Sequence, residues 1–153
     1  MNLILWRHAE AHNLLPGQDD LERTLTPKGE KQAKRMAQWL DRQLPDRTRI
    51  LVSPARRTEQ TAAALGRKFK LRPELAPDCS VAQLLQAAEW PVVEGFVLVV
   101  GHQPTLGQTV SQLMGWSENE CAVKRGAAWW LRSRVRDSQI QTVVVTVQSP
   151  ELL

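Results

Sequence analysis

The sequence predicts an α/β fold: a three-layer α/β/α sandwich whose mostly parallel sheet has an antiparallel edge. Short apolar runs alternate with segments of helical periodicity over the first 115 residues, a pattern typical of a parallel sheet covered on both faces. Two β-like runs, near residues 127–131 and 140–147, then follow with a polar turn between them and predict a hairpin. A chain of 153 residues suits one core, so we expect a single domain over residues 1–153.

The first half of the chain predicts two strand–helix units. Thr26-Pro27 is a helix start, because threonine caps free N–H groups and proline suits the first turn. Pro45 ends that helix, and Ser53-Pro54 repeats the start signal after a second apolar run. The expected elements are a strand at 2–6, a helix at 27–44, a strand at 49–52 and a helix from 54 to about 68.

The second half predicts a weak strand, two helices and the most apolar strand of the chain. Ser80 and Gln83 have the spacing of a capping box and open a helix that Pro91 ends. Residues 96–100 are all apolar, so this strand should lie at the centre of the sheet. The remaining expected elements are a strand near 70–74 and a helix over 106–114 that Gly115 closes.

Composition and charge exclude several classes of protein. With 42% hydrophobic residues the chain is not disordered, and no apolar run approaches the roughly 20 residues that cross a bilayer. Arg7 and His8 interrupt the first apolar run too early for a signal peptide. Cys79 and Cys121 lack metal-type spacing and read as free thiols in a reducing compartment. We therefore expect a cytoplasmic monomer without membrane association, and its net charge of +4 favours anionic partners.

Chemically active residues follow three of the expected strands. Arg7-His8 ends the first strand, Ser53 follows the second, and Gly101-His102 follows the most apolar one. Ligands bind at the carboxyl ends of parallel strands, so these segments should meet at one edge of the sheet. We predict that His8 is a nucleophile and that Arg7 and His102 belong to an anion pocket around it. His12 has no such context and is assigned to a loop.

Two arginines break a local rule at the start of the second helix. A cation in the first helical turn opposes the helix dipole, whereas the free N–H groups there attract anions. An arginine beside such a helix start makes a good phosphate site, because its guanidinium can hold two phosphate oxygens. We assign this role to Arg56 and place Arg57 on the solvated surface.

These segments resemble the histidine phosphatase superfamily, also called phosphoglycerate-mutase-like. The resemblance spans about residues 2–115, and the four blocks occur in the family's order. They are Leu5-Trp6-Arg7-His8-Ala9-Glu10, Arg23-x-Leu25-Thr26-x-x-Gly29, Ser53-Pro54-Ala55-Arg56-Arg57-Thr58-Glu59-Gln60-Thr61-Ala62, and Gly101-His102. The chain departs from the family signature at Ala9, where the usual residue is glycine. The short length and the second block resemble most closely the family's phosphohistidine phosphatases.

The resemblance implies a phosphoglycerate-mutase-like fold and a phosphatase without metal or other cofactor. His8 would carry a phosphoryl group, Arg7 and Arg56 would hold phosphate oxygens, and His102 would complete the pocket. Arg23 matches a family arginine at the phosphate's edge. The expected substrate is a phosphohistidine-bearing protein, such as a phosphotransfer or signalling domain.

The general acid of many family members has no clear match in this chain. Glu74 and Asp78 are the nearest candidates, and we expect neither to serve. The gap suits a phosphoramidate substrate, because an imidazole leaving group can be protonated on its own ring. We also predict a lowered pKa for His8, because nearby guanidiniums disfavour its protonation.

Three other functions remain open. The first is a small-molecule phosphomonoesterase of the same fold, and the second is a catalytically inactive phosphate-binding module. The third is nucleic-acid binding through Arg132, Arg134 and Arg136, which share one strand face next to Trp129-Trp130. Arginines that protect an exposed strand from aggregation explain that face more simply, so we expect no nucleic-acid partner.

Overall fold

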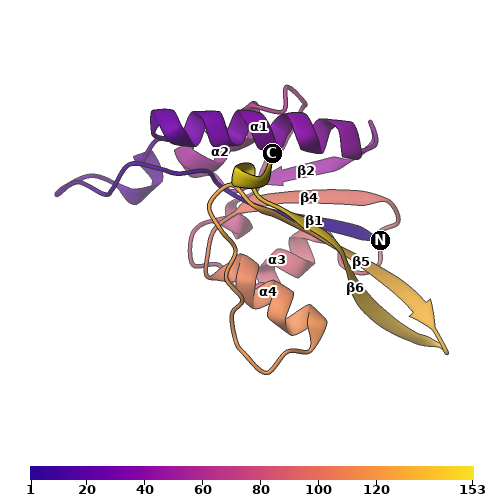
Figure 1. Cartoon of the computed structure of the whole chain (residues 1–153). Helices are drawn as coiled ribbons and strands as arrows, with labels where there is room; N and C mark the ends of the chain where they lie inside the picture. The colour runs from indigo at the N-terminus through magenta and orange to yellow at the C-terminus, as the bar shows by residue number, and fades with distance from the viewer.

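The computed structural model describes all of residues 1–153 and contains a six-stranded sheet in the order β3-β2-β4-β1-β5-β6 (Figure 1). Strands β1 to β4 are parallel, and β5 and β6 pair antiparallel at one edge. The strands are β1 (Asn2–Arg7), β2 (Arg49–Val52), β3 (Lys70–Leu71), β4 (Phe96–Gly101), β5 (Ala128–Arg136) and β6 (Gln139–Gln148). The helices are α1 (Pro27–Gln43), α2 (Arg56–Ala63), α3 (Val81–Ala88) and α4 (Thr105–Met114), with three short 3-10 helices at Asp20–Glu22, Pro73–Leu75 and Pro150–Leu152.

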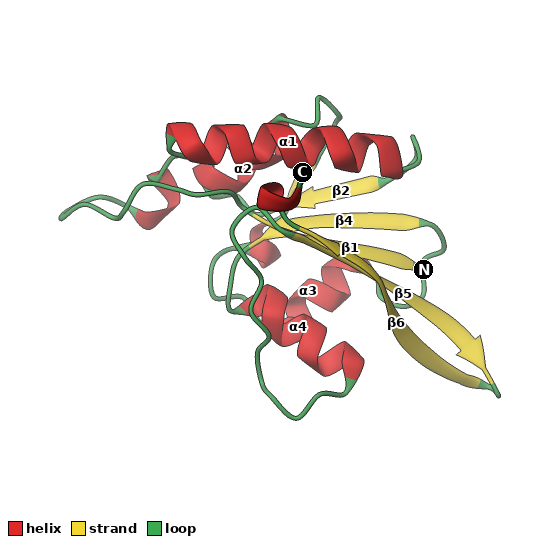
Figure 2. Cartoon of the chain, in the orientation of Figure 1, coloured by secondary structure: helices red, strands yellow, loops and turns green.

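The helices form two layers, with α1 and α2 on one face of the sheet and α3 and α4 on the other (Figure 2). Strand β1 shows how the core is divided, because successive side chains point to opposite faces. Leu3 and Leu5 pack with α3 and α4, whereas Ile4 and Trp6 pack with α1 and α2. The predicted three-layer α/β fold is confirmed, and β4 lies in the interior of the sheet as expected. No helix combines the length and the apolar character needed to cross a membrane.

Helices α1 and α3 start where the sequence signals predict. Helix α2 instead starts at Arg56, two residues after the predicted Pro54, and its N-cap Ala55 makes no side-chain cap, so the Ser53-Pro54 start is wrong. Two elements also end earlier than predicted. Thr26 caps α1 by accepting from the Gly29 N–H at 3.0 Å, and Ser80 and Gln83 form the expected capping box. Helix α2 ends at Ala63 instead of near residue 68, and Gly66 follows it with a φ of +68° that a helix cannot contain. The weak third strand shrinks to two residues before a 3-10 helix begins at Pro73, because proline cannot donate to a sheet ladder.

Strand register brings the three predicted site segments together. Arg7 pairs with Gly101 in the β1–β4 ladder, and Val52 pairs with Val100 in the β2–β4 ladder. The residues that follow these pairs are His8, His102 and Ser53, so all three leave the sheet at one edge. The backbone continues this order past the strands, because the His8 N–H donates to the Gly101 carbonyl at 3.1 Å.

Candidate active site

A pocket of about 330 Å³ lies at this edge of the sheet. It gathers His8 and His102 with four arginines, two aspartates and a few neutral residues. Its lining residues are Arg7, His8, Ala11, Asn13, Asp20, Arg23, Arg57, Pro77, Asp78, His102, Gln103 and Arg125. Cations outnumber carboxylates, so the pocket favours an anion.

His8 is oriented by one hydrogen bond from its ring. Nδ1 lies 2.7 Å from the Ala9 carbonyl oxygen, and a carbonyl can only accept, so Nδ1 carries the proton. The lone pair of the neutral ring is therefore on Nε2, the nitrogen left for the pocket. Burial, opposed by the Ala9 bond and assisted by Arg57 and Arg7, lowers the pKa of His8 to about 3. The predicted direction is confirmed, but burial and not the guanidinium charge is the largest cause.

His102 lies beside His8, with 5.3 Å between the ring centroids and 56° between the ring planes. Its Nε2 is 2.7 Å from the Ser53 hydroxyl, so the residue after β2 holds the ring that follows β4. Burial, with smaller effects of His8 and Arg57, lowers the pKa of His102 to about 2. Both imidazoles are therefore neutral at physiological pH and bring no positive charge of their own.

Arg57 lines the pocket where Arg56 was expected, and Arg56 lies outside it, so the structure places the two arginines the other way round from the prediction. The Arg57 side chain is 4% exposed and donates from Nη1 to the Asp20 carbonyl at 2.8 Å, whereas Arg56 is exposed and lies outside the pocket. The cause is helical phase. Arg57 lies four residues before Thr61, a buried residue of α2, so the two share one face of the helix. The spacing of Arg57 and Thr61 along the helix is the sequence signal that distinguishes Arg57 from Arg56.

Asp20 joins two of the pocket's arginines. Its carboxylate accepts from Arg57 Nη2 at 3.0 Å and from Arg23 Nε at 2.9 Å. Partial burial raises the pKa of Asp20, but the hydrogen bonds and charges of Arg57 and Arg23 outweigh it and lower the pKa overall. Arg23 also donates to the His12 carbonyl at 3.0 Å, which places it in the pocket wall as predicted. No sequence pattern identifies Asp20 as a pocket residue, because only the fold brings its loop to α2.

The turn after β1 is held from two helices. The Ala9 N–H donates to the Thr61 hydroxyl of α2 at 3.1 Å, and the Glu10 N–H donates to Gln32 Oε1 of α1 at 3.0 Å. A Cβ at Gly29 would overlap the Glu10 carbonyl oxygen, so glycine lets α1 pack against this turn. Ala9 is fully buried and has no positive φ, so its methyl group is accommodated without backbone strain.

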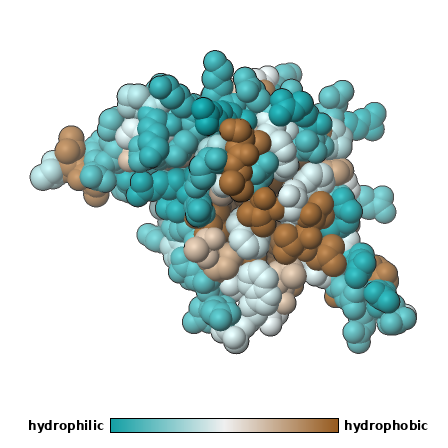
Figure 3. Space-filling model, in the orientation of Figure 1, coloured by the Kyte–Doolittle hydropathy of each residue, from teal (hydrophilic) through white to brown (hydrophobic).

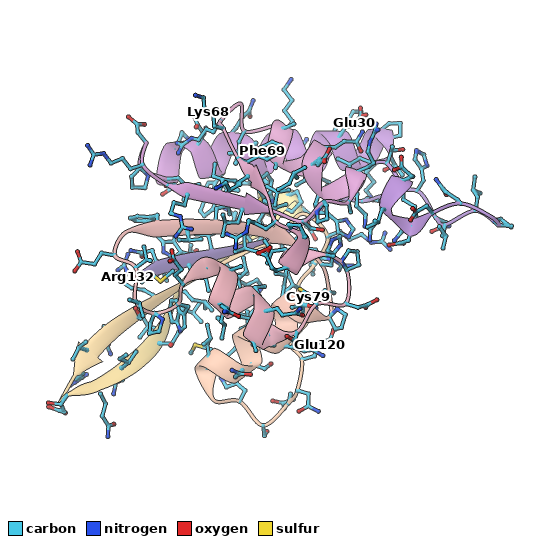
Figure 4. The ribbon with its side chains drawn as sticks, turned by 180° about the vertical axis from the view of Figure 1, so that it is seen from behind. Glu30, Lys68, Phe69, Cys79, Glu120 and Arg132 are labelled. Carbon is cyan, nitrogen blue, oxygen red and sulfur yellow. The ribbon has the colours of Figure 1, made fainter.

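The two candidate acids occupy different places. Glu74 accepts from Arg72 Nε at 2.8 Å outside the pocket, and this hydrogen bond lowers its pKa, which keeps it ionised. Asp78 lines the pocket in an exposed turn with a φ of 67°. Cys79, the next residue (Figure 4), is a free thiol that lies beside Thr105. Burial raises the pKa of the Cys79 thiol and of the Cys121 thiol.

We expect the free energy of unfolding to decrease as the pH is lowered below about 6.5, because of the two buried histidines. The unfolded chain binds their protons near the ordinary pKa of 6.5, whereas the native protein does so only near 3 and 2. Each ring contributes at most about 1.4 kcal/mol per pH unit in that interval. Urea unfolding of the parent and of His8→Asn, in phosphate-free buffer, measures the effect. In the variant, the slope of the unfolding free energy against pH should be smaller by the contribution of one histidine. Equal slopes in the two proteins would contradict the lowered pKa of His8.

The comparisons with known proteins agree with this geometry. Residues 3–80 match the family model of the histidine phosphatase superfamily, branch 1, and this match includes the first three sequence blocks. The chain is 34% identical over 121 residues to phosphohistidine phosphatase SixA of Escherichia coli strain K12, covering 74% of each protein. The chain belongs to the histidine phosphatase superfamily. It is a phosphatase of this superfamily and resembles SixA.

Solved structures of other proteins show the same fold. Protein histidine phosphatase SixA complexed with tungstate has a TM-score of 0.78 to this chain at 28% identity and covers 99% of both. A phosphoserine phosphatase mutant (H9A) from Entamoeba histolytica, complexed with phosphoserine, has a TM-score of 0.74 at 17% identity, covering 99% of this chain and 98% of its own. The fold therefore occurs in proteins named for different substrates and does not by itself select one.

Proposed function

We propose that this chain is a phosphohistidine protein phosphatase that works through a phosphohistidine intermediate on His8. One observation carries the proposal most strongly. Four buried side-chain polar atoms lack a hydrogen-bond partner, and three of them belong to pocket residues: Arg7 Nε, Arg57 Nε and His102 Nδ1. An unpaired buried polar group costs roughly 1–3 kcal/mol, so such groups are expected where a ligand meets them. A phosphoryl group between the arginines supplies acceptor oxygens, and tungstate in the solved SixA relative is an oxyanion of that kind.

The proposed reaction has two in-line displacements at phosphorus. The lone pair on His8 Nε2 attacks, the bond from phosphorus to the leaving nitrogen breaks, and that electron pair stays on the leaving imidazole. Water then attacks the phosphoryl group on His8 and releases inorganic phosphate, restoring the neutral ring. Arg7 and Arg57 stabilise the charge on the phosphoryl oxygens, and His102 completes the pocket. Positioning and charge stabilisation supply most of the catalysis in phosphoryl transfer.

The carboxylates of the pocket favour a phosphoramidate over a phosphate ester. Asp20 is held ionised by two arginines and has no proton to give, so Asp78 is the pocket carboxyl without such a partner. An alkoxide leaving group needs an acid, whereas a departing imidazole takes its proton at its second nitrogen. The presence of Asp78 keeps a small-molecule phosphomonoesterase as the second candidate function.

Asp78→Asn separates the two candidates. For a phosphohistidine phosphatase we expect turnover of a phosphohistidine-bearing phosphotransfer domain to stay within about threefold of the parent, because no enzymatic acid is required. Turnover of sugar phosphates by the parent should be far slower. A loss of a hundredfold or more on phosphohistidine would show that Asp78 donates a proton. Efficient turnover of sugar phosphates, abolished in the variant, would establish the phosphomonoesterase. Glu74→Gln is the matched control outside the pocket.

We expect activity to survive an excess of EDTA. The pocket holds four arginines, which supply the positive charge that a metal ion provides in other phosphatases. The chain has no group of three or more histidine, cysteine or acidic side chains placed to hold a metal ion. Phosphate release measured before and after chelation, and again after adding Mg²⁺ or Zn²⁺, tests this. A loss on chelation that metal restores would contradict the mechanism.

Nucleic-acid binding has little support in the structure. Arg132 lies on β5, at the amino end of β1, because it pairs with Asn2 (Figure 4). Its Nε donates to the Asn2 amide oxygen at 2.8 Å, and its guanidinium lies 5.9 Å from the centroid of the Trp130 ring. Arg132 therefore makes contacts within the fold, at the end of the sheet opposite the pocket.

A further inference from the structure

A segment of residues 11–23, called the arm below, projects from the domain (Figure 1). Its base is fixed by a β-bridge between Ala11 and Leu25 and by the His12 N–H, which donates to the Thr24 carbonyl at 2.9 Å. Its tip is a turn in which the Leu15 N–H donates to Gln18 Oε1 at 3.1 Å. The arm is therefore an ordered part of the structure with its own hydrogen bonds.

The tip of the arm presents two adjacent leucines to solvent. Leu14 is 52% exposed and Leu15 is 64% exposed, and the space-filling view shows hydrophobic atoms at the end of this projection among hydrophilic ones (Figure 3). Residues 13–18 carry no charge, unlike the arginines and aspartates around the pocket mouth. Exposing two neighbouring leucines on an ordered projection gains nothing for the fold, because neither contributes to the core.

The arm is continuous with the pocket. Ala11, Asn13, Asp20 and Arg23 all line the pocket, and Leu14 directly follows Asn13 in the chain. A histidine side chain is short, so a protein that places its phosphohistidine against His8 must bring its own surface to the pocket mouth. That surface then meets the arm, whereas a free metabolite in the pocket extends no further than the mouth.

We infer that Leu14 and Leu15 form a docking contact for the phosphohistidine-bearing protein, an inference that rests on the proposed function. The partner's phosphorylated side chain enters the cationic pocket, and an apolar patch next to its histidine packs on the two leucines. Apolar anchors beside a charged contact are typical of protein interfaces. The arm then contributes to the affinity for protein substrates and leaves the chemical step unchanged.

The test compares two substrates that share one chemical bond. The probes are a histidine-phosphorylated phosphotransfer domain and the free amino acid phosphohistidine. In Leu14→Ser/Leu15→Ser we expect KM for the phosphoprotein to rise tenfold or more, with kcat within twofold and free phosphohistidine turnover unchanged. Val92→Ser is the matched control, because Val92 is 82% exposed and precedes β4 at the other end of the sheet.

Each other outcome overturns the inference in a distinguishable way. An unchanged KM for the phosphoprotein in the double variant shows that the leucines do not dock the substrate. An equal loss on both substrates shows that the arm acts on the pocket and not on a partner. If the parent hydrolyses free phosphohistidine or phosphate esters but not the phosphoprotein, the proposed function fails, and the docking contact fails with it.

Discussion

His8→Asn should lower phosphatase turnover by roughly four orders of magnitude or more, the loss that removal of a nucleophile causes in well-studied hydrolases. Asparagine keeps a polar group near the Ala9 carbonyl, which the ring Nδ1 contacts at 2.7 Å, but it has no basic lone pair in the place of Nε2. The variant should still bind inorganic phosphate, because Arg7 and Arg57 remain. Phosphate release gives the rate, and phosphate binding shows that the pocket persists.

Rapid acid quenching is the wrong way to trap the proposed intermediate, because phosphohistidine is a phosphoramidate and hydrolyses in acid. Denaturation in alkali preserves it. The parent, mixed with labelled substrate, should carry label that survives alkali, is lost in acid and maps to His8. His12→Asn is the control variant, because His12 lies in the arm and outside the pocket, and it should label like the parent. Label on another residue, or full activity in His8→Asn, would refute the role of His8.

The sequence predicts the position of the site well where the position depends on strands. Each apolar run of β1, β2 and β4 ends abruptly in polar residues, and parallel strands end at a common edge. For this reason the sequence alone predicts that His8, Arg7 and His102 lie together. Helical periodicity also predicts the orientation of Arg57, because Arg57 and Thr61 are four residues apart and share a face of α2. Distance from the strand end favours Arg56, whereas the helical periodicity of α2 turns Arg57 toward the pocket.

Other parts of the pocket depend on loops and could not be predicted. Asp20 reaches Arg57 across 37 positions in sequence, and Arg125 enters from the loop before β5. Their positions follow from loop paths, which apolar periodicity does not specify. The size of the pKa shift of His8 could not be predicted either. Its main cause is burial, and burial depends on every segment that covers the ring.

The adjacent arginines of α2 provide the sharpest test of the pocket. Arg57→Ala should reduce kcat/KM for a phosphohistidine substrate by about a hundredfold to a thousandfold, the usual effect of removing one group that stabilises transition-state charge. Arg56→Ala removes the same side chain one position earlier and should stay within twofold, because Arg56 is exposed and outside the pocket. Steady-state kinetics on both variants, with thermal unfolding to confirm the fold, measures the contrast.

Arg57→Lys distinguishes charge from geometry at this position. Lysine keeps the positive charge but loses the planar guanidinium that contacts the carbonyl and the carboxylate of Asp20 while its Nε remains unpaired. If the guanidinium holds phosphoryl oxygens, lysine should recover only a small part of the activity lost in Arg57→Ala. Recovery to near the parental rate would mean that a point charge is sufficient. A large loss in Arg56→Ala with a small one in Arg57→Ala would assign the phosphate contact to Arg56, because the phosphate would then lie over the exposed side of the helix start.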